Sequence, residues 1–203
     1  MVKIAVLVSG GGTNLQAILD AQQRGELAHG RVTLVVSSRP GVYALERANA
    51  AKIDSLVVAR KNYATSAEFD AAMVRTLREH DIAMVVLAGF LTILGAEFIA
   101  AYRDRILNIH PSLIPSFCGQ GYYGLRVHQA ALQAGVKVTG ATAHLVNEVC
   151  DGGRILLQKA VEVLPGDTPE SLQLRVMQQA EWELLPKATE LLAQEIATAK
   201  TNL

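Results

Sequence analysis

The chain has 203 residues and a mass of 21.8 kDa, which suits one sizeable domain rather than two. Lys and Arg together number 19 and balance 19 Asp and Glu, which argues against a nucleic-acid partner because such binders carry a basic excess. Half of the residues are apolar, which excludes a disordered chain. Two cysteines are too few for a disulfide scaffold and suit a reducing compartment.

The amino-terminal apolar run covers residues 4–8 and stops at Ser9. That run is too short for a signal sequence or a membrane span. We therefore expect a cytoplasmic protein with no membrane partner.

Short apolar runs alternate with segments of helical periodicity through the first half of the chain. Runs of this kind are typical of strands that are covered on both faces of a parallel sheet. The predicted strands are 4–8, 32–36, 55–58, 84–87 and 106–109. The predicted helices are 14–24, 43–51, 67–80 and 95–102.

The pattern changes after residue 110. Prolines and glycines predict a long ordered loop over 110–124, followed by a helix at 125–134. Two β-rich runs, 136–146 and 155–163, are joined closely enough to be antiparallel additions. From Pro169 the chain is predicted helical, with Pro186 breaking or kinking it after Leu185. The fold class is α/β: one domain over 1–203, with a doubly wound, mostly parallel sheet and late antiparallel strands.

The segment 9–14, Ser-Gly-Gly-Gly-Thr-Asn, lies between the first predicted strand and helix. A glycine-rich turn before a helix lets backbone amides approach an anion, so we predict a phosphate monoester site. The dinucleotide pattern is incomplete, because Leu15 stands where its third glycine belongs. A tight turn capped by Thr13 or Asn14 remains the alternative.

Asn108 and His110 lie at the carboxyl end of the fifth predicted strand, where open parallel sheets place ligands. Strand alternation puts both side chains on one face. An amide that stabilises an oxyanion beside an imidazole that moves a proton suits acyl transfer. A structural role for a lone histidine is the competing interpretation.

Asp151 precedes two glycines in the connection between the late β-runs. Such an acid is usually a turn residue. The functional interpretation is that its carboxylate orients a histidine or stabilises the charged form of that histidine. The sequence alone does not show that it meets His110.

The other polar candidates are weaker. Cys118 has no evident partner base, and the remaining histidines lack metal-ligand spacing, so we expect no metal site. Trp182 is most simply a core residue and Glu181 a solvated helix charge.

Four ordered segments resemble the phosphoribosylglycinamide formyltransferase family, over about residues 3–190. These segments are SGGGTNLQAI, VVLAGFLTIL, LNIHPSLIPSF and GATAHLVNEVCDGG. The resemblance implies a Rossmann-like fold and transfer of the formyl group of 10-formyltetrahydrofolate to the amine of 5-phosphoribosylglycinamide. The products would be formylglycinamide ribonucleotide and tetrahydrofolate, in purine biosynthesis.

The same resemblance implies a catalytic trio of Asn108, His110 and Asp151. Asn108 and a protonated His110 would stabilise the oxyanion, while Asp151 would hold and charge the imidazole and help to relay a proton. Glu181 would be a partner for the glycinamide amine.

The resemblance also implies the binding segments. The substrate phosphate would lie on Gly12, Thr13 and Asn14. The folate would lie against Leu91, Thr92, Ile93, Leu94 and Asn108. Ser66 stands where the family often has a folate-contacting arginine, with Arg60 or Lys61 as substitutes.

Three alternatives share parts of this pattern. A formyltetrahydrofolate deformylase has an extra amino-terminal domain, and a methionyl-tRNA formyltransferase an extra carboxyl-terminal one, so length disfavours both. A catalytically silent nucleotide-binding module would not need the trio. We expect a monomer or homodimer that acts on small molecules.

Overall fold

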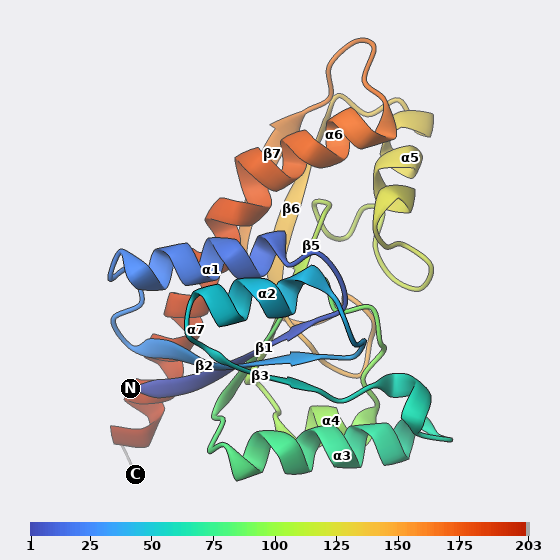
Figure 1. The fold of residues 1–203 in the computed structure, drawn as a ribbon. Coiled ribbons are helices and arrows are strands. Elements are labelled where there is room, and N and C mark those ends of the chain that lie inside the picture. The colour runs from blue at the N-terminus through green and yellow to red at the C-terminus, as the bar shows by residue number, and fades with distance from the viewer. Residues whose placement is uncertain (202–203) are drawn as a thin grey trace.

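The computed structural model describes residues 1–201 and contains an α/β fold (Figure 1). Across these residues seven strands form one sheet, in the order β3-β2-β1-β4-β5-β6-β7. The strands are β1 (Val2–Val8), β2 (Gly30–Ser37), β3 (Asp54–Val57), β4 (Met84–Leu87), β5 (Ile106–His110), β6 (Val138–Leu145) and β7 (Ile155–Glu162). Strands β1 to β5 pair in parallel, whereas β6 and β7 are antiparallel. The predicted fold class is therefore confirmed.

The helices lie close to their predicted positions. They are α1 (Thr13–Gln23), α2 (Tyr43–Ala50), α3 (Ser66–Glu79), α4 (Ala96–Ala101), α5 (Leu125–Gln133), α6 (Pro169–Val176) and α7 (Trp182–Thr201), with a short 3-10 helix at Arg60–Asn62. The predicted loop 110–124 begins one residue later, because His110 ends β5, and 111–124 contains neither helix nor strand.

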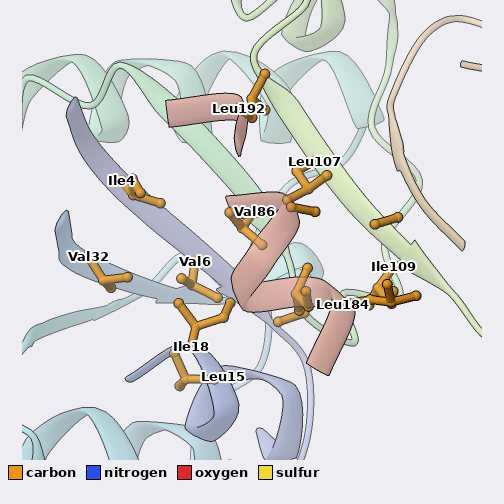
Figure 2. Packing of buried hydrophobic residues seen from close by; sticks show 14 of the residues in the cluster. Ile4, Val6, Leu15, Ile18, Val32, Val86, Leu107, Ile109, Leu184 and Leu192 are labelled. Atoms are coloured by element: carbon orange, nitrogen blue, oxygen red, sulfur yellow. The ribbon is translucent and has the colours of Figure 1, made fainter. Parts of the chain in front are cut away.

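Alternate residues of the central strands pack against helices on opposite faces of the sheet. On one face Ile4, Val6 and Val86 meet α1 and α7 (Figure 2). On the other face Leu7 and Val85 meet the buried side chains of α3 and α4. Burial on both faces explains why these strands are continuous apolar runs, and it holds their carboxyl ends in fixed positions.

Two local predictions were wrong. The run 55–58 was interpreted as a covered strand, but all four residues of β3 are exposed, because β3 is the edge strand of the sheet. Pro186 was expected to break or kink the helix after Leu185, and the break is wrong, because Pro186 lies inside α7. The irregularity comes earlier, as a π-helical turn at Met177–Glu181, where one wide turn disturbs the hydrogen-bond ladder.

Candidate active site

Strand β5 stands between the parallel and antiparallel parts of the sheet. It pairs in parallel with β4 and antiparallel with β6, which places Asn108 opposite His144 and His110 opposite Thr142. Its carboxyl end therefore carries two polar side chains into the place where the sheet changes direction. The β6–β7 connection brings Asp151 to the same place.

Four side chains meet there. The amide nitrogen of Asn108 lies 3.1 Å from Nε2 of His144. The carboxylate of Asp151 lies between two imidazoles, with Oδ2 3.5 Å from Nδ1 of His110 and Oδ1 3.6 Å from Nε2 of His144. We call Asn108, His110, His144 and Asp151 the polar cluster. The structure thus brings together the predicted trio and adds a second histidine.

The loop 111–124 closes over this cluster. The carbonyl oxygen of Phe117 lies 2.9 Å from Nε2 of His110, and the backbone N–H of Gly119 donates to Oδ2 of Asp151 at 2.8 Å. Phe117 has a φ of 50°, in the left-handed region that non-glycine residues rarely adopt. The loop therefore occupies hydrogen-bonding positions of both His110 and Asp151.

Burial and charge act in opposite directions on the pKa values of this cluster. Burial lowers the pKa of His110, although the Phe117 carbonyl and the negative charge of Asp151 oppose the change. For Asp151, burial alone would raise the pKa, but His144, the Gly119 N–H and the field of His110 together hold it below its ordinary value. Asp151 is therefore a carboxylate at neutral pH, and the imidazole of His110 is predominantly neutral.

Both ring nitrogens of His110 face acceptors. A neutral imidazole has one N–H, and the short contact to Phe117 assigns it to Nε2. Nδ1 then faces Asp151 across 3.5 Å without a proton between them. If the ring takes up a second proton, both nitrogens have acceptors already in place, so the site is arranged to hold an imidazolium transiently.

His144 was not predicted as a site residue. It is almost fully buried, and its Nδ1 lies 2.8 Å from the carbonyl oxygen of Leu145. Its Nε2 faces both the amide nitrogen of Asn108 and the carboxylate of Asp151. The sequence signals were its place in a predicted strand and in the motif GATAHLVNEVCDGG, and the pairing register that brings it to Asn108 comes from the structure.

The glycine turn adopts the geometry of an anion site. Gly12 is the N-cap of α1 with a φ of 73°, and within residues 1–201 no side chain caps that end. A Cβ on Gly12 would lie 2.7 Å from the Cβ of Ala44, so glycine is required there. The proposed cap by Thr13 or Asn14 is wrong, and the first amides of α1 are left for a ligand.

Arg47 of α2 braces this turn. Its Nε donates to the carbonyl of Gly11 at 2.8 Å, and Nη1 donates to Oε1 of Gln16 at 2.9 Å. The guanidinium lies over the ring of Tyr43. A positive charge therefore stands beside the turn that the sequence had identified only by its glycines.

Glu181 is not the solvated helix charge that the residues alone suggested. It is 7% exposed and accepts a hydrogen bond from Nδ2 of Asn14 at 2.7 Å. Burial raises its pKa, and the Asn14 hydrogen bond opposes that change. Glu181 ends the π-helical turn, and Trp182, predicted to be core, is half-buried with its Nε1 unpartnered within the described part of the chain.

The segment 91–94 follows β4. Leu91 and Ile93 expose large apolar side chains, whereas Leu94 is buried against the core formed with α3 and α4. In a different segment, Nη2 of Arg60 donates to Oγ of Ser66 at 3.3 Å. Arg60 thus reaches the position where the resemblance had indicated a missing arginine.

A cavity of about 280 Å³ adjoins the glycine turn. It is lined by Thr13, Gln16, Ala17, Asp20, Arg24, Arg47 and Trp182. It contacts the turn but none of the polar cluster. Within residues 1–201 no group of three metal-ligating side chains is found, and no helix is long and apolar enough to cross a membrane.

Comparisons with known proteins show the family to which the chain belongs. The family described as formyl transferase matches residues 2–189. A phosphoribosylglycinamide formyltransferase from Haemophilus influenzae is 39% identical over 203 residues, covering all of this chain and 92% of the relative. A solved glycinamide ribonucleotide transformylase from Symbiobacterium toebii has a TM-score of 0.90 and 43% identity, covering 96% of this chain and 89% of its own.

Other relatives are much longer. The trifunctional purine biosynthetic proteins adenosine-3 of Drosophila melanogaster and Gallus gallus are 40% and 43% identical, over 97% and 95% of this chain. The chain spans only 15% and 18% of their respective lengths.

Proposed function

We propose, from the premise that this chain belongs to the formyl transferase family, that it transfers a formyl group from 10-formyltetrahydrofolate to the amine of 5-phosphoribosylglycinamide. The observation that carries the proposal is the polar cluster: Asn108, His110 and Asp151 converge at the carboxyl end of β5, together with His144. Relatives named for this activity cover nearly the whole chain. Its cytoplasmic location, its state as a monomer or homodimer and its single domain over 1–203 remain predictions.

The proposed binding arrangement uses two neighbouring segments. The substrate phosphate accepts hydrogen bonds from the amides of Gly12, Thr13 and Asn14, with Arg47 close behind the turn. The folate lies against 91–94, where exposed Leu91 and Ile93 offer apolar contacts to a flat ring. In this proposal Glu181 accepts a hydrogen bond from the substrate amine, and its hydrogen bond from Asn14, a residue of the proposed phosphate site, supports that role.

The proposed chemistry begins with the uncharged amine attacking the formyl carbon. A C–N bond forms, and the π-electron pair of the formyl C=O moves to the oxygen, which becomes an oxyanion. This oxyanion accepts hydrogen bonds from Asn108 and from Nε2 of His110. The Phe117 carbonyl now occupies the position that this oxygen would take, so the loop must yield to the substrate.

Collapse of the intermediate breaks the bond from the formyl carbon to the folate nitrogen. The proton lost by the attacking amine goes to that nitrogen, so the products are formylglycinamide ribonucleotide and tetrahydrofolate. Nε2 of His110 gives its proton to that nitrogen and takes in exchange the proton lost by the amine, while the Asp151 carboxylate stabilises the positive charge that develops on the imidazole. No metal is needed for this sequence of steps.

The test follows tetrahydrofolate release from 10-formyltetrahydrofolate, with and without the ribonucleotide. We expect release that depends on the ribonucleotide and that falls by about 10²- to 10⁴-fold in His110→Ala. His80→Ala is the matched control, because His80 binds only the carbonyl of Thr76 at the end of α3. Equal release without the ribonucleotide would instead identify a deformylase, and binding without release would identify a silent nucleotide-binding module.

A further inference from the structure

The hydroxyl of Ser9 joins three segments at the carboxyl ends of β1, β2 and β4. Its Oγ lies 2.7 Å from Oγ of Ser38 and accepts a hydrogen bond from the backbone N–H of Leu91 at 3.0 Å. Ser9 and Ser38 are each 3% exposed. The contact is therefore buried, and water does not compete for it.

This hydroxyl links the two segments that the proposed function assigns to the two substrates. Ser9 directly precedes the glycine turn, and Leu91 begins the segment 91–94. The parallel pairing of β1 with β4 ends where the N–H of Ala88 donates to the carbonyl of Leu7. Among the described residues, the link from Ser9 to Leu91 is the hydrogen bond that continues this connection beyond the ladder.

Loss of the hydroxyl would separate the segments. Without Oγ, the N–H of Leu91 and the buried hydroxyl of Ser38 would each lose a hydrogen-bond partner. The Leu91 segment would then be free to move relative to the turn. No other side chain in the described structure takes over the Leu91 N–H.

We propose that Ser9 is a positioning residue that couples the two substrate sites, so that occupancy of one site orders the other. The inference rests on the proposed function, because it takes the glycine turn as the phosphate site and 91–94 as the folate site. Coupling of this kind is a free energy shared between two ligands, and it acts equally in both directions. Ser9 touches neither ligand in this scheme and acts through backbone position.

The experiment uses two ligands that cannot react with each other. Tetrahydrofolate carries no formyl group, so it forms a stable ternary complex with 5-phosphoribosylglycinamide. Calorimetric titration gives the Kd of the ribonucleotide with and without saturating tetrahydrofolate. We expect tetrahydrofolate to tighten ribonucleotide binding by about 5- to 150-fold in the unaltered protein. We call the ratio of the Kd without tetrahydrofolate to the Kd with it the coupling ratio. In Ser9→Ala the coupling ratio should fall to within about twofold of one.

Two variants separate coupling from general damage. Ser37→Ala is the matched control, because Ser37 at the end of β2 is also buried, but among the described residues its hydroxyl bonds only to the backbone of Arg39. It should keep the coupling ratio while losing comparable thermal stability. Ser38→Ala removes one of the two Ser9 contacts and keeps the bond to Leu91, so its ratio should be intermediate. If Ser9→Ala fails to fold, Ser38→Ala still tests the link.

Each outcome decides between the claims. A protein that binds both ligands without coupling, or a Ser9→Ala variant that keeps the full ratio, overturns the coupling role and leaves the proposed function standing. A protein that binds neither ligand overturns both.

Discussion

The parallel and antiparallel parts of the sheet contribute to the candidate site in different ways. The parallel part, β3-β2-β1-β4, supplies backbone amides at the glycine turn and the uncharged hydroxyl of Ser9. The antiparallel part, β6-β7, supplies the titratable groups of His144 and Asp151. Strand β5 joins them and carries Asn108 and His110.

Under the proposed function, this division separates binding from chemistry. The position of the backbone amides at the glycine turn is set by steric constraints. Binding there should therefore depend on φ angles and close packing rather than on charge. The polar cluster depends on where protons lie, so a change of one atom alters it without moving the chain. We therefore expect charge changes in the antiparallel part to reduce turnover greatly, and backbone changes in the parallel part to reduce binding more modestly.

The largest expected effect follows from Asp151→Asn. Asp151 has a φ of 55°, which asparagine tolerates, so the connection should keep its shape. The amide cannot stabilise an imidazolium, so turnover should fall by about 10²- to 10⁴-fold with little change in thermal stability. Because the Asp151 charge raises the pKa of His110, its removal should lower that pKa further.

Steady-state kinetics and an NMR titration of the ring protons check both parts of this prediction. Asp54→Asn on the exposed edge strand β3 is the control, and it should change neither turnover nor the His110 titration. An unchanged or raised His110 pKa in Asp151→Asn would show that the carboxylate does not act on this imidazole.

The same division explains what the sequence could predict. Covered strands such as β1 and β4 are continuous apolar runs, so the parallel part was placed to within a few residues. His144 was missed because it meets Asn108 across 36 residues, through a strand register that local patterns do not encode. Glu181 was read as a solvated charge because its partner Asn14 is 167 residues away and a π turn shifts the helical period.

A smaller effect is expected when the glycine turn is altered. Gly12→Ala would place a side chain at a φ of 73° and press its Cβ against Ala44, at a cost of about 1–2 kcal/mol in backbone strain alone. The KM for the ribonucleotide should rise about tenfold or more, while kcat changes less, because the polar cluster is intact. Gly10→Ala is the matched control, because a Cβ there meets no atom within 4 Å. Equal KM values for the two variants would mean that the turn does not hold the phosphate.

The smallest effect, and one of opposite sign for stability, is expected from Glu181→Gln. Burial raises the folded-state pKa of Glu181 above its unfolded value, so the folded protein binds this proton more tightly. The unaltered protein should therefore lose stability as pH rises from the unfolded pKa through the folded one. Glutamine keeps the acceptor for Asn14 and carries no charge, so the free energy of unfolding of the variant should rise by about 1 kcal/mol at neutral pH, or roughly 2–4 °C in Tm.

Thermal melts of Glu181→Gln across pH should show this gain in stability shrinking in acid. A gain that does not depend on pH would show that the carboxylate charge is not its source. If Glu181 also binds the substrate amine, the stabilised variant should have a raised KM for the ribonucleotide, so that binding beside the glycine turn would depend on a side-chain charge as well as on backbone amides.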